Sequence, residues 1–415
     1  MDKQKQASVA GALDGVDVLD FTHALSGPLC TAILADFGAR VIKVEKPGIG
    51  DATRYMSMKE EKVPDPVQGS TSFLCVNKNK EGIVLDLSKP EGRQIARDLA
   101  AKCDVVVENF RPGVMKRLGL CYEDLQQVNP SLIYCDISAY SYGPLAQEPG
   151  YDLVVQARAG TIAITGEPGG RPLRPGVSVC DVSTGLIAAN GVLLALYARS
   201  QTGKGQKVNV SLYDSTLFTL SQYITPVLYN NVDLEPMGAG HLQICPYQSF
   251  PTADGWIFVC CATDEFFRRL CNGLGLPELA NDERFTSNPL RVKHKEELSS
   301  PLNEVFRTKC TKEWERILHE LDIPSSPVVT PLNAFRQALE FGSPMVELVQ
   351  HPYYGTVHMP GRAIVLSETP GKTKRYPPRL GEDTHSVLRE FLDFDMDSLT
   401  RLERDGIISQ YREQA

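Results

Sequence analysis

The sequence lacks the patterns that mark metal-binding, secreted and membrane-spanning proteins. Its 11 cysteines are scattered and form neither a CxxC motif nor a Cys/His cluster of the zinc type. No metal site is therefore predicted, and reduced thiols in a reducing compartment are expected. No apolar run approaches the roughly 20 residues of a membrane span. Residues 1–15 carry neither the apolar core of a signal peptide nor an Arg-rich transit pattern. We expect a cytoplasmic protein, with the mitochondrion as the alternative in a eukaryotic cell.

Basic charge and phosphate-binding glycine motifs are also missing. The formal net charge of −8 argues against a nucleic-acid surface, although a local patch can still attract an anion. The segment HALSGPLC, residues 23–30, holds a single glycine where a dinucleotide site needs G-x-G-x-x-G, so NAD binding is disfavoured. Neither a Walker loop nor a G-x-S-x-G motif occurs. A dehydrogenase, an NTPase and a serine hydrolase are therefore poor interpretations.

Strand and helix patterns alternate through the first half of the chain. Strand patterns cover residues 15–21, 39–47, 82–88, 104–110, 131–140 and 207–212, with helical patterns at 29–38, 90–102 and 112–119. This alternation is typical of βαβ units and a parallel sheet. We predict an α/β fold: a Rossmann-like large domain with a mostly parallel sheet, and a smaller α+β domain.

The length of 415 residues favours two domains. The texture changes near residues 230–250, where loops and a hairpin with the turn TADG replace the alternation. We place the N-terminal part of the large domain at 10–225 and the small α+β domain at 226–328. Residues 329–415 are interpreted as a linker and a return to the large domain, ending in a last helix at 383–392.

Asp181 stands out because it precedes a long apolar run in RPGVSVCDVSTGLIAANGVLLAL, residues 174–196. One interpretation is an ordinary helix N-cap. The other is a carboxylate that does chemistry at a helix start. Asp152, directly after Tyr151, raises the same choice. His23 lies in the loop after the first predicted strand, where α/β folds bind ligands, although a lone histidine usually has no special role.

Eight segments in order resemble the class III CoA-transferases, the superfamily of formyl-CoA transferase, carnitine CoA-transferase and α-methylacyl-CoA racemase. They are LDGVDVLDFTHALSGP, ADFGARVIKVEKPGIGDATR, NKNKEGIVLDLSKPEGR, DVVVENFRPGVMKRLGL, NPSLIYCDISAYSYGP, PGYDLVVQARAG, RPGVSVCDVSTGL and TGKGQKVNVSLYDS. Two later segments, at 237–259 and 285–298, are similar to the succinyl-CoA:glutarate branch of the family.

The resemblance implies that Asp181 is a nucleophile. Its carboxylate would attack an acyl-CoA thioester to give an aspartyl-acyl anhydride, and the CoA thiolate would return to form an aspartyl-CoA thioester. An Asp of ordinary pKa, about 3.9, is ionised at pH 7 and needs no base to activate it. Each step develops an oxyanion that needs backbone N–H donors. Small neighbours such as Gly176, Ser178, Ser183 and Gly185 leave room for them.

The resemblance also implies which residues bind the substrates. Tyr151, Asp152 and His23 are expected beside the nucleophile. The expected CoA contacts are Ala24, Leu25, Ser26, Lys46, Leu85, Asn109, Phe110 and Arg117, with Arg117 the favoured phosphate partner by charge. A dicarboxylate needs a cation for its distal carboxylate, best a bidentate Arg. The unranked candidates are Arg54, Arg174, His241 and Arg291. CoA thioesters are substrates, and no permanently bound cofactor is predicted.

Three alternatives stay open at this point. A 2-methylacyl-CoA racemase shares fold and ligand, but its GHD motif is GYD here, and Tyr151, with an ordinary pKa near 10, is a poor base for proton exchange. A non-catalytic CoA-binding protein would be expected to lose Asp181. A NAD dehydrogenase would need the glycine motif that this chain lacks.

We therefore expect an acyl-CoA and a small carboxylic acid as partners: succinyl-CoA as donor and a C4–C6 dicarboxylate such as glutarate or itaconate as acceptor. The resemblance implies an interlocked homodimer, and neither nucleic acid nor a membrane is expected as a partner.

Overall fold

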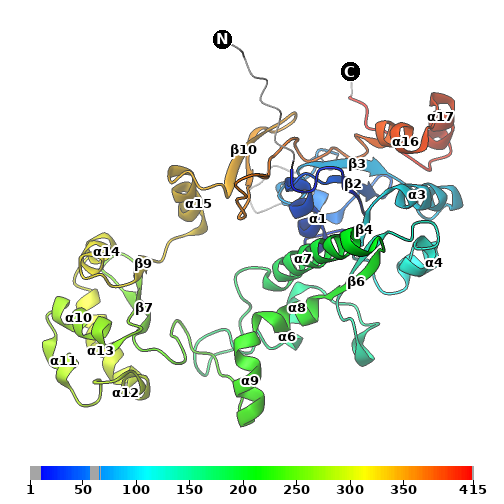
Figure 1. Ribbon diagram of the computed structural model, residues 1–415. Helices are drawn as coiled ribbons and strands as arrows, with labels where there is room; N and C mark the ends of the chain where they lie inside the picture. The colour runs from blue at the N-terminus through cyan, green and yellow to red at the C-terminus, as the bar shows by residue number, and fades with distance from the viewer. Residues whose placement is uncertain (1–10, 57–64, 66, 414–415) are drawn as a thin grey trace. The chain divides into compact units, whose positions relative to one another are not determined.

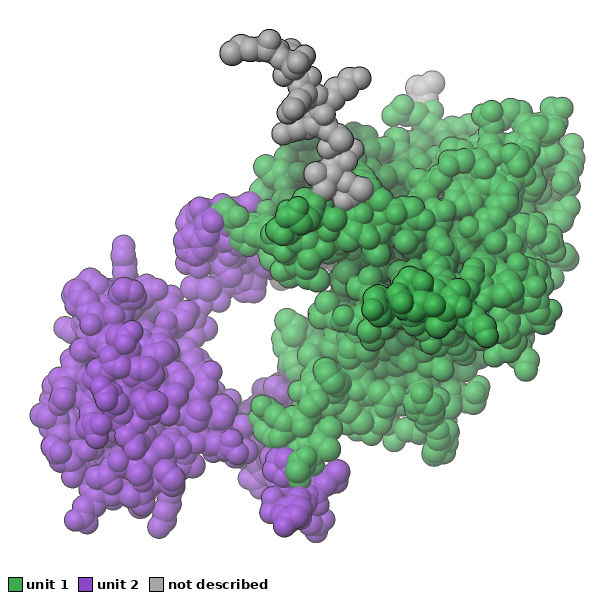
Figure 2. All heavy atoms as spheres, viewed as in Figure 1, with its two compact units in different colours: residues 1–159, 175–225, 342–415 green, residues 160–174, 226–341 purple. Residues whose placement is uncertain are grey.

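A computed structural model describes residues 11–56, 65 and 67–413. The chain forms two compact units, coloured separately in Figure 2. Unit 1 comprises residues 1–159, 175–225 and 342–415, and unit 2 comprises residues 160–174 and 226–341. Two segments differ from the predicted boundaries, because 160–174 and 329–341 make their contacts within unit 2. Sequence texture does not show this, since only the packing partners of the two segments assign them to unit 2.

Unit 1 is built on one parallel sheet of six strands (Figure 1). The strands are β1 (Asp17–Asp20), β2 (Arg40–Glu45), β3 (Lys80–Val84), β4 (Val105–Glu108), β5 (Ile133–Ser138) and β6 (Gln206–Ser211). Their order is β3-β2-β1-β4-β5-β6, and every pair is parallel. This is the order of the doubly wound dinucleotide-binding folds. The predicted α/β class with a mostly parallel sheet is confirmed.

The helices of unit 1 follow the strands as the alternation predicts. They are α1 (Ser26–Asp36), α2 (Thr71–Leu74), α3 (Pro90–Lys102), α4 (Val114–Leu118), α5 (Tyr122–Leu125), α6 (Asp152–Arg158), α7 (Val179–Thr202), α8 (Leu212–Thr219), α16 (Thr384–Leu392) and α17 (Met396–Arg404), with short 3-10 turns at Ala52–Tyr55 and Gly143–Leu145. α9 (Ser221–Asn230) runs from unit 1 into unit 2. A hairpin of β10 (Val346–His351) and β11 (Gly355–Pro360) belongs to unit 1. The helix predicted as the last one is α16, but α17 follows it.

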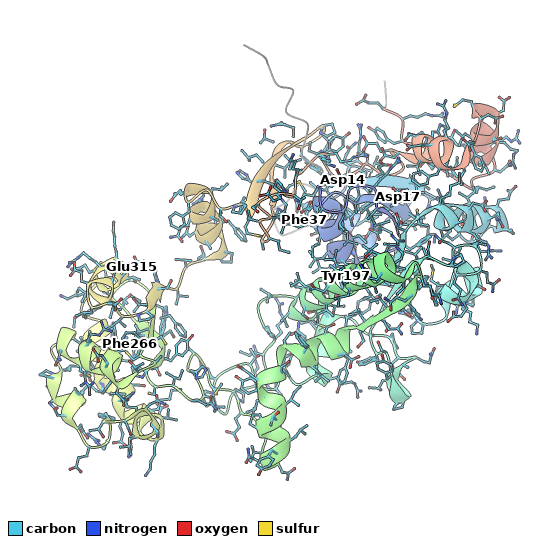
Figure 3. All side chains as sticks on the ribbon, in the orientation of Figure 1. Asp14, Asp17, Phe37, Tyr197, Phe266 and Glu315 are labelled. Carbon is cyan, nitrogen blue, oxygen red and sulfur yellow. The ribbon has the colours of Figure 1, made fainter. Side chains whose placement is uncertain are left out.

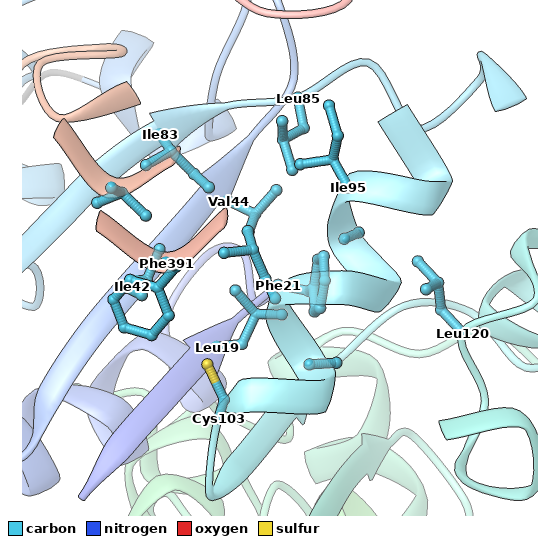
Figure 4. Close-up of a cluster of buried hydrophobic side chains, with 14 of the residues drawn as sticks. Leu19, Phe21, Ile42, Val44, Ile83, Leu85, Ile95, Cys103, Leu120 and Phe391 are labelled. Atoms are coloured by element: carbon cyan, nitrogen blue, oxygen red, sulfur yellow. The ribbon is translucent and has the colours of Figure 1, made fainter. Parts of the chain in front are cut away.

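Side chains alternate between two cores on the faces of the sheet. Leu19 of β1 lies in one core and Val18 in the other. The first core, shown in Figure 4, joins Phe21 and Ile42 to Ile95 of α3 and to the returning helices α16 and α17. The second core packs α1 and α7 on the opposite face. Because both faces are covered, the strands read as nearly continuous apolar runs.

α7 corrects the expectation that no apolar segment approaches the length of a membrane span. Among the described helices it is long and apolar enough, by length and composition, to cross a membrane. It packs inside unit 1 against α1, α8 and β6. Its buried face consists of small residues, which lets α1 approach closely; they are Cys180, Thr184, Gly185, Ala188, Ala189, Val192 and Ala195. The apolar run therefore supplies a core helix of unit 1.

Unit 2 has the α+β character that the sequence indicates for the smaller domain. Its sheet is β7 (Tyr247–Pro251), β8 (Trp256–Cys260) and β9 (Ser325–Pro327), all antiparallel. The predicted TADG turn joins β7 to β8. The helices are α10 (Asp264–Gly273), α11 (Pro277–Asn281), α12 (Asn288–Lys293), α13 (Lys295–Phe306), α14 (Thr311–Glu320) and α15 (Pro331–Glu340). In Figure 3, Phe266 and Glu315 mark α10 and α14.

Candidate functional site

The sheet order places a cavity at the carboxyl ends of β1 and β4. These two strands are neighbours, and the chain leaves them toward opposite edges of the sheet, which is where open α/β sheets bind ligands. The cavity has a volume of about 270 Å3 and lies wholly within unit 1. Eight predicted site residues line it: His23, Ala24, Ser26, Asn109, Phe110, Tyr151, Asp152 and Asp181. The fold thus brings together residues that are up to 158 positions apart in the sequence, from His23 to Asp181.

The loop after β1 is held from two sides. The His23 backbone N–H donates to Asn109 Oδ1, and Asn109 Nδ2 donates to the His23 carbonyl, both at 2.8 Å. The next residue, Ala24, has a positive φ of 64°, which a residue with a side chain rarely adopts. Its N–H donates to Asp51 Oδ1 at 3.3 Å. These contacts fix the path of the backbone into α1, so that Ser26 begins the helix at the cavity wall.

His23 is a neutral side chain at pH 7. Burial lowers its pKa from 6.5, and the positive charge of Lys43 lowers it further. Its ring packs edge-on against Phe110, with 5.1 Å between centroids. His23 therefore contributes shape and a polar edge to the cavity and no positive charge.

Asp181 is the third residue of α7. The N-cap of this helix is Ser178, so the N-cap interpretation of Asp181 is wrong by three positions. Its backbone N–H, which has no partner within the helix, donates to Asp152 Oδ1 at 3.1 Å. Asp152 Oδ2 in turn accepts from Gln156 Nε2 at 2.6 Å. Asp152 starts α6 and ties its first turn to the first turn of α7.

The environment makes Asp181 a more basic carboxylate than the sequence suggests. Burial raises its pKa from 3.8 to about 6, and the neighbouring negative charge of Asp152 adds to the rise. A hydrogen bond from the Ser26 hydroxyl opposes both effects. The position in a first helical turn favours the anion, but it does not outweigh burial and the second carboxylate. At pH 7 the group is still mainly ionised.

Beneath the loop lie two buried ion pairs that sequence reasoning missed. Lys43 Nζ contacts Asp51 at 3.1 Å, and Lys80 Nζ contacts Asp20 at 3.1 Å, all four side chains being fully buried. Lys43 also donates to the carbonyl of Thr22 at 2.8 Å. The available signal was a lysine inside a central strand, at RVIKVE, because a buried charge needs a partner. The pairs support the loop that carries His23 and Ser26.

Other predicted CoA contacts lie outside the lining of this cavity. The side chain of Leu85 belongs to the first core, and its backbone pairs with Ile408. Lys46 and Arg117 are exposed after β2 and on α4, respectively. Leu25 is the N-cap residue of α1. Their proposed contacts with CoA stay predictions.

Two of the candidates for binding a substrate carboxylate are engaged elsewhere. Arg54 is fully buried, and its Nε and Nη2 donate to the two oxygens of Glu45 at 2.7 and 2.6 Å. Arg291 of unit 2 is also fully buried and donates to the carbonyls of Cys245 and Phe285 and to Asp264. Both arginines are structural, because moving either would leave buried partners unpaired.

The remaining two candidates both belong to unit 2. Arg174 is exposed at the end of the segment 160–174. His241 stacks on Tyr247 with 5.2 Å between ring centroids, and its Nδ1 accepts from the Gln243 N–H at 3.1 Å. Neither belongs to the lining of the Asp181 cavity.

The cavity also contains charged residues that the sequence patterns did not single out. Arg111 and Glu148 line it, and Arg111 directly follows Asn109 and Phe110 in the segment ENFRPG. Arg111 could have been singled out from the sequence, because it lies in a segment that resembles the family. In the described part of the chain, no group of three or more His, Cys, Asp or Glu side chains could hold a metal ion.

Comparison with known proteins decides the family. The family model described as CoA-transferase family III matches residues 13–384. The chain belongs to CoA-transferase family III. This transferase is 37% identical over 402 residues to succinyl-CoA:glutarate CoA-transferase of Homo sapiens, covering 96% of this chain and 90% of that relative. It is 36% identical to acetyl-CoA:oxalate CoA-transferase of Acetobacter aceti, covering 94% and 98% of the two chains.

A solved structure supports the same assignment. The crystal structure of a CAIB/BAIF family protein from Brucella suis matches this transferase with a TM-score of 0.82 at 32% identity. The match covers 92% of this chain and 100% of that one. The predicted family and enzyme class are confirmed, and the substrates of the transferase are CoA thioesters.

Proposed function

We propose that this transferase moves CoA from succinyl-CoA to glutarate, with itaconate or another C4–C6 dicarboxylate as the alternative acceptor, and that Asp181 carries the intermediates. One observation supports the role of Asp181 above others. It is a partly buried carboxylate of raised pKa in a cavity at the switch point of the sheet, beside the first turns of α1 and α7. The names of the human and Acetobacter aceti relatives support a dicarboxylate acceptor.

The proposed reaction consists of two matched exchanges. An Asp181 oxygen attacks the thioester carbonyl of succinyl-CoA, the C–S bond breaks, and an aspartyl-succinyl anhydride and CoA thiolate result. The thiolate attacks the aspartyl carbonyl and releases succinate, leaving an aspartyl-CoA thioester. A glutarate carboxylate attacks that thioester, and the thiolate then attacks the glutaryl carbonyl. Glutaryl-CoA leaves and the Asp181 carboxylate is restored.

The surroundings of Asp181 suit this chemistry. A carboxylate with a pKa of about 6 is a stronger nucleophile than an ordinary Asp and still mainly ionised at pH 7. The first amides of α1, at Ser26 and Gly27, have no partners within the helix and can donate to a developing oxyanion. Asp152 holds the first turn of α7 in place through its hydrogen bond to the Asp181 amide.

The racemase alternative has less support. It needs an acid/base side chain at the position of Tyr151, which is 72% exposed and carries a phenol in place of the imidazole of the GHD motif. We also propose that the reaction uses no permanently bound cofactor. The eleven free cysteines support a reducing compartment, for which the cytoplasm is our proposal and the mitochondrion its alternative.

A trapping experiment tests the covalent route. The protein is incubated with succinyl-CoA and hydroxylamine, digested, and examined by mass spectrometry for a hydroxamate on Asp181. We expect the modification in the native protein and none in Asp181→Asn, which should still fold and bind CoA but lose exchange. Asp152→Asn is the matched control, because it removes a neighbouring charge and keeps the nucleophile. An unmodified Asp181 together with α-proton exchange of a 2-methylacyl-CoA in D2O would favour the racemase.

We further infer that two copies associate through α7, which has a second apolar face besides the buried one. Val182, Leu186, Leu193 and Tyr197 recur at intervals of four or seven residues and are exposed, as is Leu194. Figure 3 labels Tyr197 on this helix. An exposed apolar stripe of this kind is typical of a protein–protein contact. The resemblance of the sequence to the family supports an interlocked arrangement of the two chains.

A further inference from the structure

The charges around the Asp181 cavity are unbalanced. Among the described residues that line it, Glu148, Asp152 and Asp181 are acids, and Arg111 is the one Lys or Arg. His23 is neutral, because burial and Lys43 lower its pKa. The inference that follows rests on the proposed function, in which the acceptor is a dicarboxylate. One carboxylate of such an acceptor reacts and the other keeps its charge. Glu148 and Asp152 would repel that charge unless a cation is close, whereas Asp181 is uncharged at this step because it is then the aspartyl-CoA thioester.

Arg111 has the freedom that Arg54 and Arg291 lack. It is exposed, and no hydrogen bond or ion pair of its guanidinium is found within the described residues. Its backbone, in contrast, is anchored on both sides. The Arg111 carbonyl accepts from the Val114 N–H at 3.1 Å, and the Phe110 N–H donates to Glu108 Oε2 at 2.8 Å. The backbone of Arg111 is therefore fixed, and its guanidinium can bind a ligand.

Arg111 also borders a second cavity of about 570 Å3 in unit 1. Phe110, Pro112 and Ser138 line both cavities as well. Arg111 thus belongs to the wall that the two cavities share. An acid bound with one carboxylate at Asp181 can extend along this wall toward Arg111.

We propose that Arg111 binds the distal carboxylate of the dicarboxylic acid and so selects dicarboxylates over monocarboxylates. A guanidinium matches a carboxylate with two parallel hydrogen bonds, the strongest simple pairing available to such a group. In this assignment Arg111 determines specificity and takes no part in the bond changes at Asp181.

The test compares two acceptors of equal length that differ in the distal carboxylate, glutarate and pentanoate, with succinyl-CoA as the donor for both. The ratio of their kcat/KM values cancels effects on the donor. Arg111→Met should lower this ratio by about 10- to 100-fold, as expected for loss of a hydrogen-bonded charge pair. Arg111→Lys should recover part of it. Because Arg111 is exposed, the variants should keep the melting temperature of the native protein.

A control and two opposing outcomes make the test decisive. Arg389→Met removes another exposed cation, on α16 and outside the lining of both cavities, and should leave the ratio unchanged. An unchanged ratio in Arg111→Met overturns the proposal. A weaker Kd for CoA alone, with both acceptors equally affected, assigns Arg111 to the CoA phosphates and overturns it too. Failure of the proposed function looks different, since the native protein would then transfer CoA to neither glutarate nor any other dicarboxylate.

Discussion

At the scale of the residue, the ionisation of Asp181 is the feature that local sequence predicts least well. An Asp in the first turn of a helix is ordinarily a good anion. Here burial comes first and the charge of Asp152 second in raising its pKa to about 6. The charge comes from Asp152 of α6, 29 positions away in sequence, and the hydrogen bond from Ser26 of α1 opposes both causes. The same residue can therefore be a solvated cap in one fold and a nucleophile in another.

This shift predicts a pH dependence. The nucleophile is the carboxylate, so kcat/KM for the acyl-CoA donor should fall as the pH falls through about 6 and level off above it. Asp152→Asn keeps an oxygen that can accept the Asp181 N–H and removes the negative charge. The acid limb should then move to lower pH, because the remaining neighbours disfavour the anion less. A limb that stays at the same pH or moves higher in this variant would contradict the electrostatic role of Asp152.

At the scale of the element, the close approach of α1 and α7 positions the site. Gly185 sits where a Cβ would lie 2.7 Å from the Ser26 carbonyl and 3.0 Å from the Leu29 Cβ. A backbone carbonyl at that distance cannot move aside without shifting α1. Ser26 is the residue whose hydroxyl bonds to Asp181, so the helix contact and the chemistry share one residue.

Gly185→Ala should therefore lower kcat and also destabilise unit 1, although alanine has the higher helix propensity. An overpacked contact of this kind costs about 1–3 kcal/mol. Gly191→Ala on the same helix is the matched control, because its Cβ would meet a side-chain atom, Val208 Cγ1 at 2.7 Å, and no backbone atom of α1. The control should lose less stability than Gly185→Ala, since the helix propensity of alanine, roughly 1 kcal/mol better than that of glycine, offsets part of the contact, and it should keep kcat. Chemical denaturation and steady-state rates of both variants would measure this, and equal effects in the two would contradict it.

At the scale of the whole molecule, the proposed interlocking of two chains has a consequence that surface contact alone does not. Interlocked chains cannot exchange partners without unfolding. Native dimers carrying two different tags should therefore form no mixed dimers on mixing. They should form them after joint unfolding and refolding.

Native mass spectrometry would detect the mixed species near twice the chain mass of 45.7 kDa, midway in mass between the two dimers that each carry one kind of tag. Exchange within minutes between folded samples would show a simple surface dimer. A single-chain mass throughout would contradict association through α7. Val128→Glu, an exposed apolar residue outside α7, is a control substitution that should leave the dimer intact, whereas Leu194→Glu on the stripe should disturb its assembly.

The sequence by itself determined the parallel α/β class, the helix at 90–102 and the family. These depend on periodicity and on motifs that are read locally, and periodicity follows from which faces a strand or helix buries. It also indicated Asp181, Asp152 and the loop from His23 to Ser26, because they lie in matched segments. It could not separate Arg54 and Arg291 from arginines that are free to bind ligands.

Only the tertiary structure decided how these charges are used. The Arg54 guanidinium is occupied by an ion pair with Glu45 and by a hydrogen bond to the carbonyl of Pro378, 324 residues away in sequence. No local pattern carries that information. The fold places Arg111 on a cavity wall, where no acid of the described residues contacts its guanidinium, and this is why we propose it as a ligand-binding residue. The pKa of Asp181 is set in the same way, by residues of α1 and α6. Burial and charge are properties of neighbours in space, and for these residues the neighbours are brought together by the sheet order.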